Sequence, residues 1–245
     1  ICTAKTGTLT EEEMEVTAIY TNNTSYIVDG KFFFEGKKQI THHEFTPLLP
    51  LFKAGVLCNN AHMEHRGKLS LIGDPTEKAL LLCAYKAGLL KEVEIKKEPR
   101  LKEFPFNSEK KTMTVICSTK SGLVSYAKGA PIALLNACSY EIIQGKKIRL
   151  TLARRQDLFK IANGFAEQSL RVLAFAYKPL PNTYTQSTTQ EEMIFIGFQG
   201  MIDPPRKEIH AAIQDCLRAG IKVKMLTGDS LATAKAISKQ IGLEG

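Results

Sequence analysis

The sequence predicts a protein of two parts, an α+β region inserted into an α/β region. Near one end, an amphipathic helix (209–219), a buried strand (221–226) and a second helix (231–241) follow one another, which is the βαβ-type rhythm of a parallel sheet. The middle of the chain instead carries short apolar segments bounded by turn residues, which is typical of antiparallel strands. Residues 2–10 indicate the end of a strand that turns into a loop rich in Gly and Thr.

The simplest architecture has three segments. Residues 1–20 and 198–245 would form a Rossmann-like domain, of which the second segment is incomplete. Residues 21–197 would form the inserted domain, with an antiparallel sheet and helices.

The individual elements follow from local pattern. Apolar segments next to turn residues predict strands at 16–20, 26–28, 32–34, 113–117, 123–127, 171–177 and 194–197. Helical spacing or continuous apolar character predicts helices at 47–60, 79–90, 131–138 and 152–168. Gly73-Asp74-Pro75-Thr76 is typical of a turn and a helix start, since Pro75 comes early and Glu77 lies in the first turn. The polar segment 179–192 is expected to be a mobile surface loop.

Composition excludes several classes of protein. The longest strongly apolar stretch, 79–90, is far shorter than the ~18 residues that a membrane helix needs. The net charge is +8, but no dense Lys/Arg block and no zinc-finger motif accompany it, so nucleic acid is not expected as a partner. The six cysteines are scattered without a Cys-x-x-Cys pair, which indicates reduced thiols in a cytosolic setting.

Two strand ends indicate a phosphate site. In 224–229 a buried strand runs into Thr227-Gly228-Asp229 and then a helix, and ligands of open α/β sheets bind beyond such strand ends. The Thr227 hydroxyl can donate to a phosphoryl oxygen, and Asp229 can bind water or hold the loop. Taken alone, this turn is equally well a helix cap.

The middle of the chain offers an aromatic ring and cations. Phe106 could stack on a base, and Lys111 and Lys128 could reach phosphates, with Gly129 permitting close approach of a ligand. The alternative is an edge strand with core Phe and solvated Lys.

A zinc site is the competing interpretation nearby. Cys58, His62 and His65 have suitable spacing and Glu64 lies close by, but no fourth ligand is obvious, and a structural role is favoured.

Several motifs together resemble one family. The run Cys2-Thr3-Ala4-Lys5-Thr6-Gly7-Thr8-Leu9-Thr10 is similar to the phosphorylation signature of P-type cation-transporting ATPases. Further motifs follow in the order of that family: Gly-Asp-Pro-Thr-Glu (73–77), Pro-Phe-Asn-Ser-Glu (105–109), Lys-Gly-Ala-Pro (128–131) and Met-Ile-Asp-Pro-Pro-Arg (201–206). The resemblance covers essentially the whole chain and is closest to the calcium-pump-like P2 group.

The resemblance implies a chemistry and also a departure from it. In the family an aspartate stands at position 4, takes a phosphoryl group from ATP and forms an acyl phosphate, with Mg²⁺ offsetting the charge. Here that position is Ala4, whose methyl group can neither attack a phosphate nor ligate a metal. The same pocket is implied to include Lys5, Thr6 with its backbone carbonyl at Mg²⁺, Thr227, Gly228 and Asp229.

The resemblance also implies a nucleotide site. Glu77 would orient adenine, Arg171 would contact a phosphate, and Asp203 would lie near the nucleotide path. They would act with Phe106, Lys111, Lys128 and Gly129. Ser108 departs from the pattern, because reticulum-type calcium pumps carry an arginine there. No Walker A sequence is present, so side chains and stacking must build the site.

We therefore expect an ATP-binding cytoplasmic fragment of an integral membrane pump, inactive itself because of Ala4. Its cofactors would be ATP and Mg²⁺. Its partners would be ATP or ADP, the transported cation, and the membrane and actuator domains of the same polypeptide. The later Gly-Asp-Gly-x-Asn-Asp segment of the family, the membrane helices and the actuator domain are not in the sequence. Two alternatives stay open: a natural non-enzymatic relative that senses nucleotide, and a phosphohydrolase of the haloacid-dehalogenase type.

Overall fold

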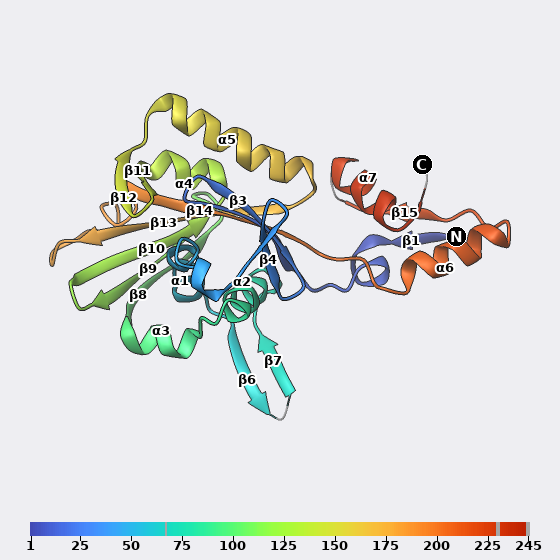
Figure 1. Ribbon diagram of the computed structural model, residues 1–245, viewed down its shortest axis with the longest axis horizontal. Coiled ribbons are helices and arrows are strands. Elements are labelled where there is room, and N and C mark those ends of the chain that lie inside the picture. Colours follow the sequence, from blue (N-terminus) through green and yellow to red (C-terminus); the bar gives the residue numbers. More distant parts are fainter. Residues whose placement is uncertain (67, 229–230, 244–245) are drawn as a thin grey trace.

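The computed structural model describes residues 1–66, 68–228 and 231–243. It has a large part built on one long sheet and a smaller part that contains both ends of the chain (Figure 1). Two strands of the large sheet, β2 (Glu15–Thr21) and β14 (Met193–Ile202), lead into the smaller part. The chain therefore leaves the small part, builds the large one and returns.

The large sheet contains eleven described strands and is mostly antiparallel. Nine of them follow the order β5-β4-β3-β2-β14-β13-β10-β9-β8, while β11 pairs parallel with β14 and antiparallel with β12. The remaining bounds are β3 Thr24–Asp29, β4 Phe32–Glu35, β5 Lys38–Ile40, β8 Arg100–Asn107, β9 Thr112–Thr119, β10 Gly122–Gly129, β11 Cys138–Ile143, β12 Lys146–Arg149 and β13 Arg171–Leu180.

Helices cover both faces of this sheet. The helices α1 (Leu49–Leu57), α2 (Pro75–Lys86) and α3 (Lys91–Lys97) lie on one side, and α4 (Pro131–Ala137) and α5 (Leu152–Glu167) on the other (Figure 1). The two layers bury separate apolar cores. Tyr126 of β10 belongs to the core under α1 and α2, whereas its neighbour Ala127 belongs to the core under α4 and α5. This is the alternation that a strand between two helical layers requires.

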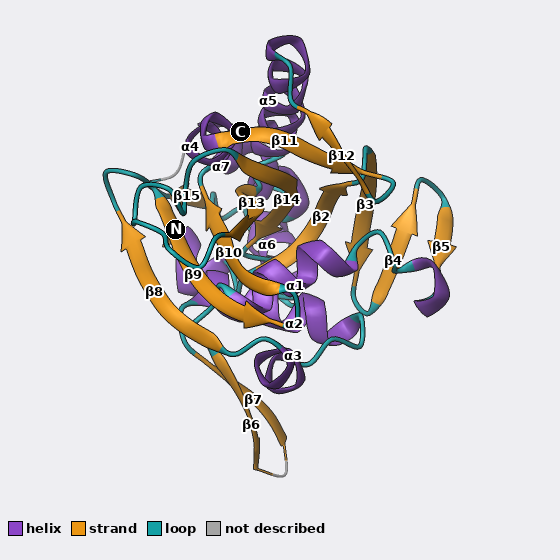
Figure 2. Ribbon diagram, turned by 90° about the vertical axis from the view of Figure 1, so that its left-hand side faces the viewer, coloured by secondary structure: helices purple, strands orange, loops and turns teal. Residues whose placement is uncertain are grey.

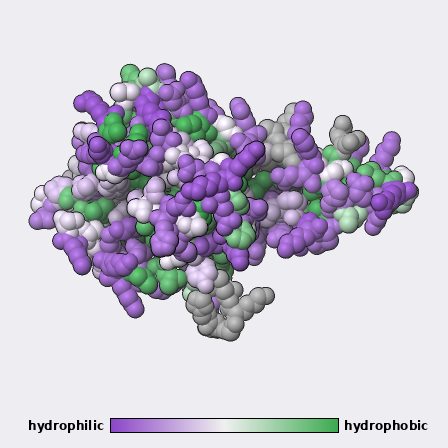
Figure 3. Space-filling model, viewed as in Figure 1, coloured by the Kyte–Doolittle hydropathy of each residue, from purple (hydrophilic) through white to green (hydrophobic). Residues whose placement is uncertain are grey.

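A two-stranded hairpin extends away from the sheet beside α2. Its strands are β6 (His62–Arg66) and β7 (Lys68–Ile72), and Figure 2 shows them projecting beyond the helices. Hydrophilic side chains predominate on the face of the molecule drawn in Figure 3, with apolar groups scattered among them.

The small part contains a short parallel sheet. β1 (Cys2–Ala4) pairs with β15 (Lys224–Leu226), and α6 (Ile209–Arg218) and α7 (Leu231–Gln240) accompany them. Its core consists of Leu9, Ile213, Ile237 and Ile241. None of the helices formed by the described residues is long and apolar enough to span a lipid bilayer.

Most predicted elements are confirmed, with shifts at their ends. The helix expected at 79–90 begins at Pro75 and ends at Lys86, and the strand expected at 221–226 is shortened to Lys224–Leu226. The elements α3, β5, β6, β7, β11 and β12 were not predicted, and β8 was considered only as the edge-strand alternative. The expected boundaries at 20/21 and 197/198 fall inside β2 and β14, so the division into domains stays a prediction.

The predicted loop at 179–192 is partly strand. β13 extends through Leu180, and the end of the loop contacts the sheet at Thr189, whose carbonyl accepts from the Ser125 hydroxyl over 3.0 Å.

Candidate functional site

Four strand ends meet at one end of the large sheet. The register pairs Asn107 with Thr112, Thr112 with Gly129, and Gly129 with Ala174. The end of β8, the start of β9, the end of β10 and the start of β13 therefore lie side by side, because adjacent antiparallel strands alternate in direction. This arrangement brings to one region four of the predicted site residues: Phe106, Lys111, Lys128 and Arg171.

Glu77 lies at this end through α2. Asp74 caps the helix, its Oδ1 accepting from the backbone N–H of Thr76 (2.8 Å) and of Glu77 (3.3 Å), with Pro75 at the first helical position. Arg171 on β13 donates to the Thr76 hydroxyl over 2.9 Å. The start of α2 is thus connected to the start of β13.

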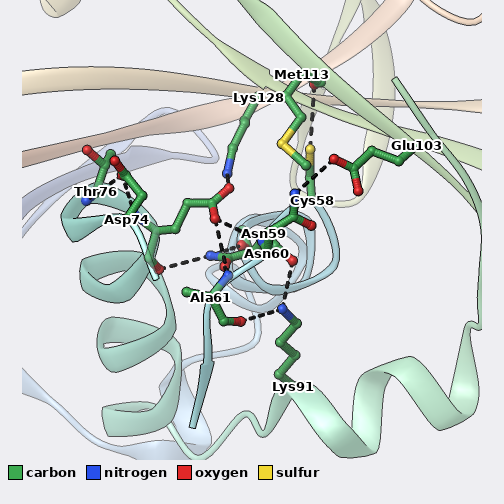
Figure 4. Close-up of polar contacts among 12 residues, drawn as sticks. Cys58, Asn59, Asn60, Ala61, Asp74, Thr76, Lys91, Glu103, Met113 and Lys128 are labelled. Atoms are coloured by element: carbon green, nitrogen blue, oxygen red, sulfur yellow. Dashed lines mark hydrogen bonds and ion pairs between the residues drawn. The ribbon is translucent and has the colours of Figure 1, made fainter. Parts of the chain in front are cut away.

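The carboxylate of Glu77 is held by three donors. Lys128 Nζ donates to its Oε1 over 2.5 Å, and the backbone N–H groups of Asn60 and Ala61 donate to its Oε2 over 2.9 and 3.1 Å (Figure 4). The side chains of Lys128 and Glu77 are 9% and 14% exposed, so the pair is almost closed off from solvent. The Lys128–Glu77 pair is therefore a buried, charge-assisted contact at the end of the sheet where the other predicted residues gather.

The β8–β9 turn positions the other two residues. Asn107 Oδ1 accepts from the backbone N–H groups of Glu109 and Lys110 at 2.9 and 2.8 Å, which closes the turn. The Phe106 ring is 63% exposed at the end of β8, and Lys111 is exposed as well. An exposed ring beside cations can stack on a base while the cations meet phosphate oxygens.

Gly129 is required by close backbone packing. A Cβ at this position would stand 2.5 Å from the carbonyl oxygen of Lys111 and 2.8 Å from Cγ2 of Thr112. The same Lys111 carbonyl accepts from the N–H of Ala130 over 3.0 Å. Glycine at position 129 therefore allows β9 and β10 to pack closely. The sequence had instead indicated that this glycine permits the close approach of a ligand.

A cavity lies elsewhere, on the α1 and α3 side of the sheet. It has a volume of 630 Å³ and is lined by the start of α1, by α3 and by Tyr126 and Tyr177 of the sheet. Its lining includes neither Glu77 nor any of the other predicted site residues.

The second predicted site lies in the small part. Ala4 of β1 pairs in parallel register with Leu226 of β15, so Lys5–Gly7 and Thr227–Gly228 leave the sheet at the same edge. Gly7 has a φ of +76°, and its carbonyl accepts from Arg206 over 3.0 Å. Asp229 lies outside the described residues.

The described residues at this edge do not suit Mg²⁺. Position 4 carries a methyl group, so it supplies no carboxylate oxygen of the kind that holds Mg²⁺. No step through Mg²⁺ is assigned to the described residues of this chain.

Asp203 contacts the connection between the two parts. Its Oδ2 accepts from the Thr10 hydroxyl over 2.6 Å, and its Oδ1 is buried without a partner among the described residues. The neighbouring Pro204 carbonyl accepts from the N–H of Glu11 over 3.0 Å. Asp203 thus contacts the other connecting segment and not the Glu77 group.

The zinc alternative finds no support among the side chains that the structure describes. Cys58 is fully buried, its thiol donates to the Met113 carbonyl over 3.5 Å, and burial raises its pKa to about 11, which keeps it protonated. His62 and Glu64 approach to 3.9 Å, and the side chain of His65 lies outside the described part. No group of three potential ligands is found among the described residues.

Sequence reasoning missed the turn that follows α1. Asn59, Asn60 and Ala61 surround Glu77, with Lys91 and Arg100 behind them. The run Cys58-Asn59-Asn60 at the end of a predicted helix indicates only that the helix ends there. The backbone N–H groups that donate to Glu77 have no signature in the sequence.

The chain belongs to the P-type ATPase family, because residues 48–208 match the family model described as "P-type ATPase, cytoplasmic domain N". Several relatives to which it is similar are calcium-transporting ATPases. It is 38% identical to Calcium-transporting ATPase 1 of Lactococcus lactis and 38% identical to the Calcium-transporting ATPase of Bacillus subtilis, over 26% and 28% of their lengths. It is 33% identical to human Calcium-transporting ATPase type 2C member 1, over 26% of that protein. Each match covers 99% of this chain, which spans about a quarter of these relatives.

Proposed function

We propose that this chain binds ATP or ADP at the end of the large sheet, as the nucleotide-binding part of a calcium-transporting P-type ATPase. The observation that carries the proposal is the buried Lys128–Glu77 pair between the exposed Phe106 ring and Arg171. Membership in the N-domain family supports it independently.

Each residue has a distinct role in this proposal. Phe106 stacks on the adenine ring, and Glu77 accepts from its exocyclic amine while holding Lys128 in place. Lys111 and Arg171 are exposed cations that meet the phosphates. Gly129 lets the β9–β10 backbone close behind them.

The small part is proposed to be a piece of a phosphorylation domain of the haloacid-dehalogenase type. Position 4 would hold the phosphorylated aspartate of the parent pump, with Lys5, Thr6, Thr227, Gly228 and Asp229 around it. Because Ala4 lacks a carboxylate, the chain itself forms no acyl phosphate. Calcium transport, ATP and Mg²⁺ as cofactors, a cytoplasmic position, and contact with membrane and actuator domains are proposed for the parent by analogy with its relatives.

Calorimetric titration of the chain with ATP tests the nucleotide site. We expect saturable binding below millimolar ATP, weakened about 10-fold or more by Lys128→Met, because a charge-assisted contact is lost. Lys146→Met changes an exposed lysine on β12 and should leave the affinity unchanged. Equal losses of ATP affinity in Lys128→Met and Lys146→Met, or no binding at millimolar ATP, would reject the proposed site.

A further inference from the structure

The turn after α1 is held from behind by two cations. Lys91, the first residue of α3, donates from Nζ to the carbonyls of Asn59 (2.7 Å) and Ala61 (2.5 Å) (Figure 4). Arg100 on β8 donates to the same Asn59 carbonyl over 2.6 Å and to Asn60 Oδ1 over 2.7 Å. Lys91 is only 8% exposed, although it carries a charge. Cations at this point complement the negative end of the α1 dipole.

One peptide group joins Lys91 to the proposed nucleotide site. The carbonyl of Asn59 and the N–H of Asn60 belong to the same peptide plane. Its oxygen accepts from Lys91 and Arg100, while its N–H donates to Glu77 Oε2 over 2.9 Å. A cation at the oxygen polarises the peptide and strengthens the hydrogen bond at the other end.

We propose that Lys91 is a positioning residue for the nucleotide site. It acts through the Asn59–Asn60 peptide, whose N–H holds the Glu77 carboxylate in place. The carboxylate in turn orients the Lys128 ammonium. The inference rests on the proposed nucleotide function and adds a residue that does not touch the nucleotide.

The surroundings of Lys91 make its charge sensitive to pH. Arg100 from β8 and Lys128 from β10 repel its charge, whereas Glu77 from α2 and Glu92 on its own helix attract it. Glu103 lies further out, paired with Arg100 over 2.7 Å. Burial is the largest effect and lowers the pKa of Lys91 to about 8. Cys58 at the end of α1 stays protonated in this range, since its pKa is about 11.

The experiment compares pH profiles of ATP affinity from pH 7.2 to 9.2, using the full chain. Wild type should lose about 10-fold in affinity as Lys91 deprotonates, which corresponds to ~1.4 kcal/mol. Lys91→Arg should keep a flat profile, because a guanidinium stays charged. Lys91→Met should bind weakly at every pH, and Lys96→Met, at an exposed lysine of the same helix, should follow wild type.

A nucleotide-free measurement separates this inference from the proposed function. The amide proton resonance of Asn60 should move with a midpoint near pH 8 in wild type and stay fixed in Lys91→Arg. A stationary Asn60 amide, or one shared affinity profile for wild type and Lys91→Arg, would overturn the positioning role. If ATP does not bind to wild type, the proposed function fails, while the Asn60 titration still decides the role of Lys91. It also decides that role if Lys91→Met fails to fold.

Discussion

At the scale of single residues, substitution of the exposed Phe106 should affect ATP binding and leave the stability of the fold almost unchanged. The side chain is 63% exposed, so Phe106→Ala should change the free energy of unfolding by less than about 0.5 kcal/mol. The same change should weaken ATP binding by about 1–3 kcal/mol, the range of base–aromatic stacking. Titration calorimetry and denaturant unfolding measure the two effects.

A matched control lies on the same strand. Leu101 of β8 is 58% exposed, and Leu101→Ala should leave both quantities unchanged. Equal ATP affinity in Phe106→Ala and wild type would remove the ring from the proposed site.

The positions of some site residues could be predicted from the sequence, but their hydrogen-bond partners could not. Pro75 and Asp74 predicted a helix start, and Glu77 was placed correctly in its first turn. Its partner Lys128 is 51 residues further along the chain, and only the strand order of the sheet brings the two together. The N–H donors of Asn60 and Ala61 could not be predicted, since every residue type except proline offers such a donor.

At the scale of elements, the contact between β9 and β10 depends on Gly129. Gly129→Ala would place a methyl 2.5 Å from the Lys111 carbonyl, and backbone cannot move as easily as a side-chain end. We expect a loss of about 1–3 kcal/mol in the free energy of unfolding, measured by urea denaturation.

The control is a glycine in open space. Nothing lies within 4 Å of a Cβ at Gly164 in α5, so Gly164→Ala should stabilise the protein by about 0.5–1 kcal/mol. A stability of Gly129→Ala equal to that of wild type would show that the backbone relaxes at no cost.

The central strand β14 carries a buried amide that lacks partners. Gln199 is 0% exposed, and neither its Nε2 nor its Oε1 has a hydrogen-bond partner among the described residues. Gln199→Met replaces the amide with an apolar group of similar size and should raise the free energy of unfolding by about 1–2 kcal/mol.

Gln199→Glu tests the same position with the opposite change. It would bury a charge and should be strongly destabilising. If thermal unfolding shows that Gln199→Met lowers the stability as much as Gln199→Glu does, the Gln199 amide has partners that stabilise the fold.

Elements were predictable where their own pattern was strong. The long helix α5 and the strands β9 and β10 combine clear apolar segments with turn residues. The helix was predicted in full, and the central five of the eight residues of each strand were predicted. In contrast, α3 is seven residues long, and all of them except Val93 and Ile95 are charged lysines or glutamates. Such a short helix exists because α1 packs against it, which is a tertiary contact that local sequence does not show.

At the scale of the whole molecule, the two connecting segments are joined at Thr10 and Asp203. Thr10→Val would leave both carboxylate oxygens of Asp203 without a partner among the described residues, because Oδ1 already has none. We expect Thr10→Val to lower the free energy of unfolding of the small part by about 1–3 kcal/mol, without an effect on the large sheet.

Hydrogen exchange measures where that loss falls. Amides of β1 and β15 should exchange faster in Thr10→Val, while those of β9 and β10 keep their rates. Thr3→Val is the control, since the Thr3 hydroxyl contacts the carbonyl of the next residue over 3.3 Å. Faster exchange throughout the large sheet would contradict two separately stabilised parts.

The central claim is that nucleotide binds at the end of the large sheet where β8, β9, β10 and β13 meet. The most direct test is a series of ¹H–¹⁵N correlation spectra of the chain as ATP is added. We expect saturable shifts that are largest at the amides of Glu77, Phe106, Lys111 and Gly129. Unchanged spectra at millimolar ATP would contradict it, as would shifts confined to the 630 Å³ cavity beside α1 and α3.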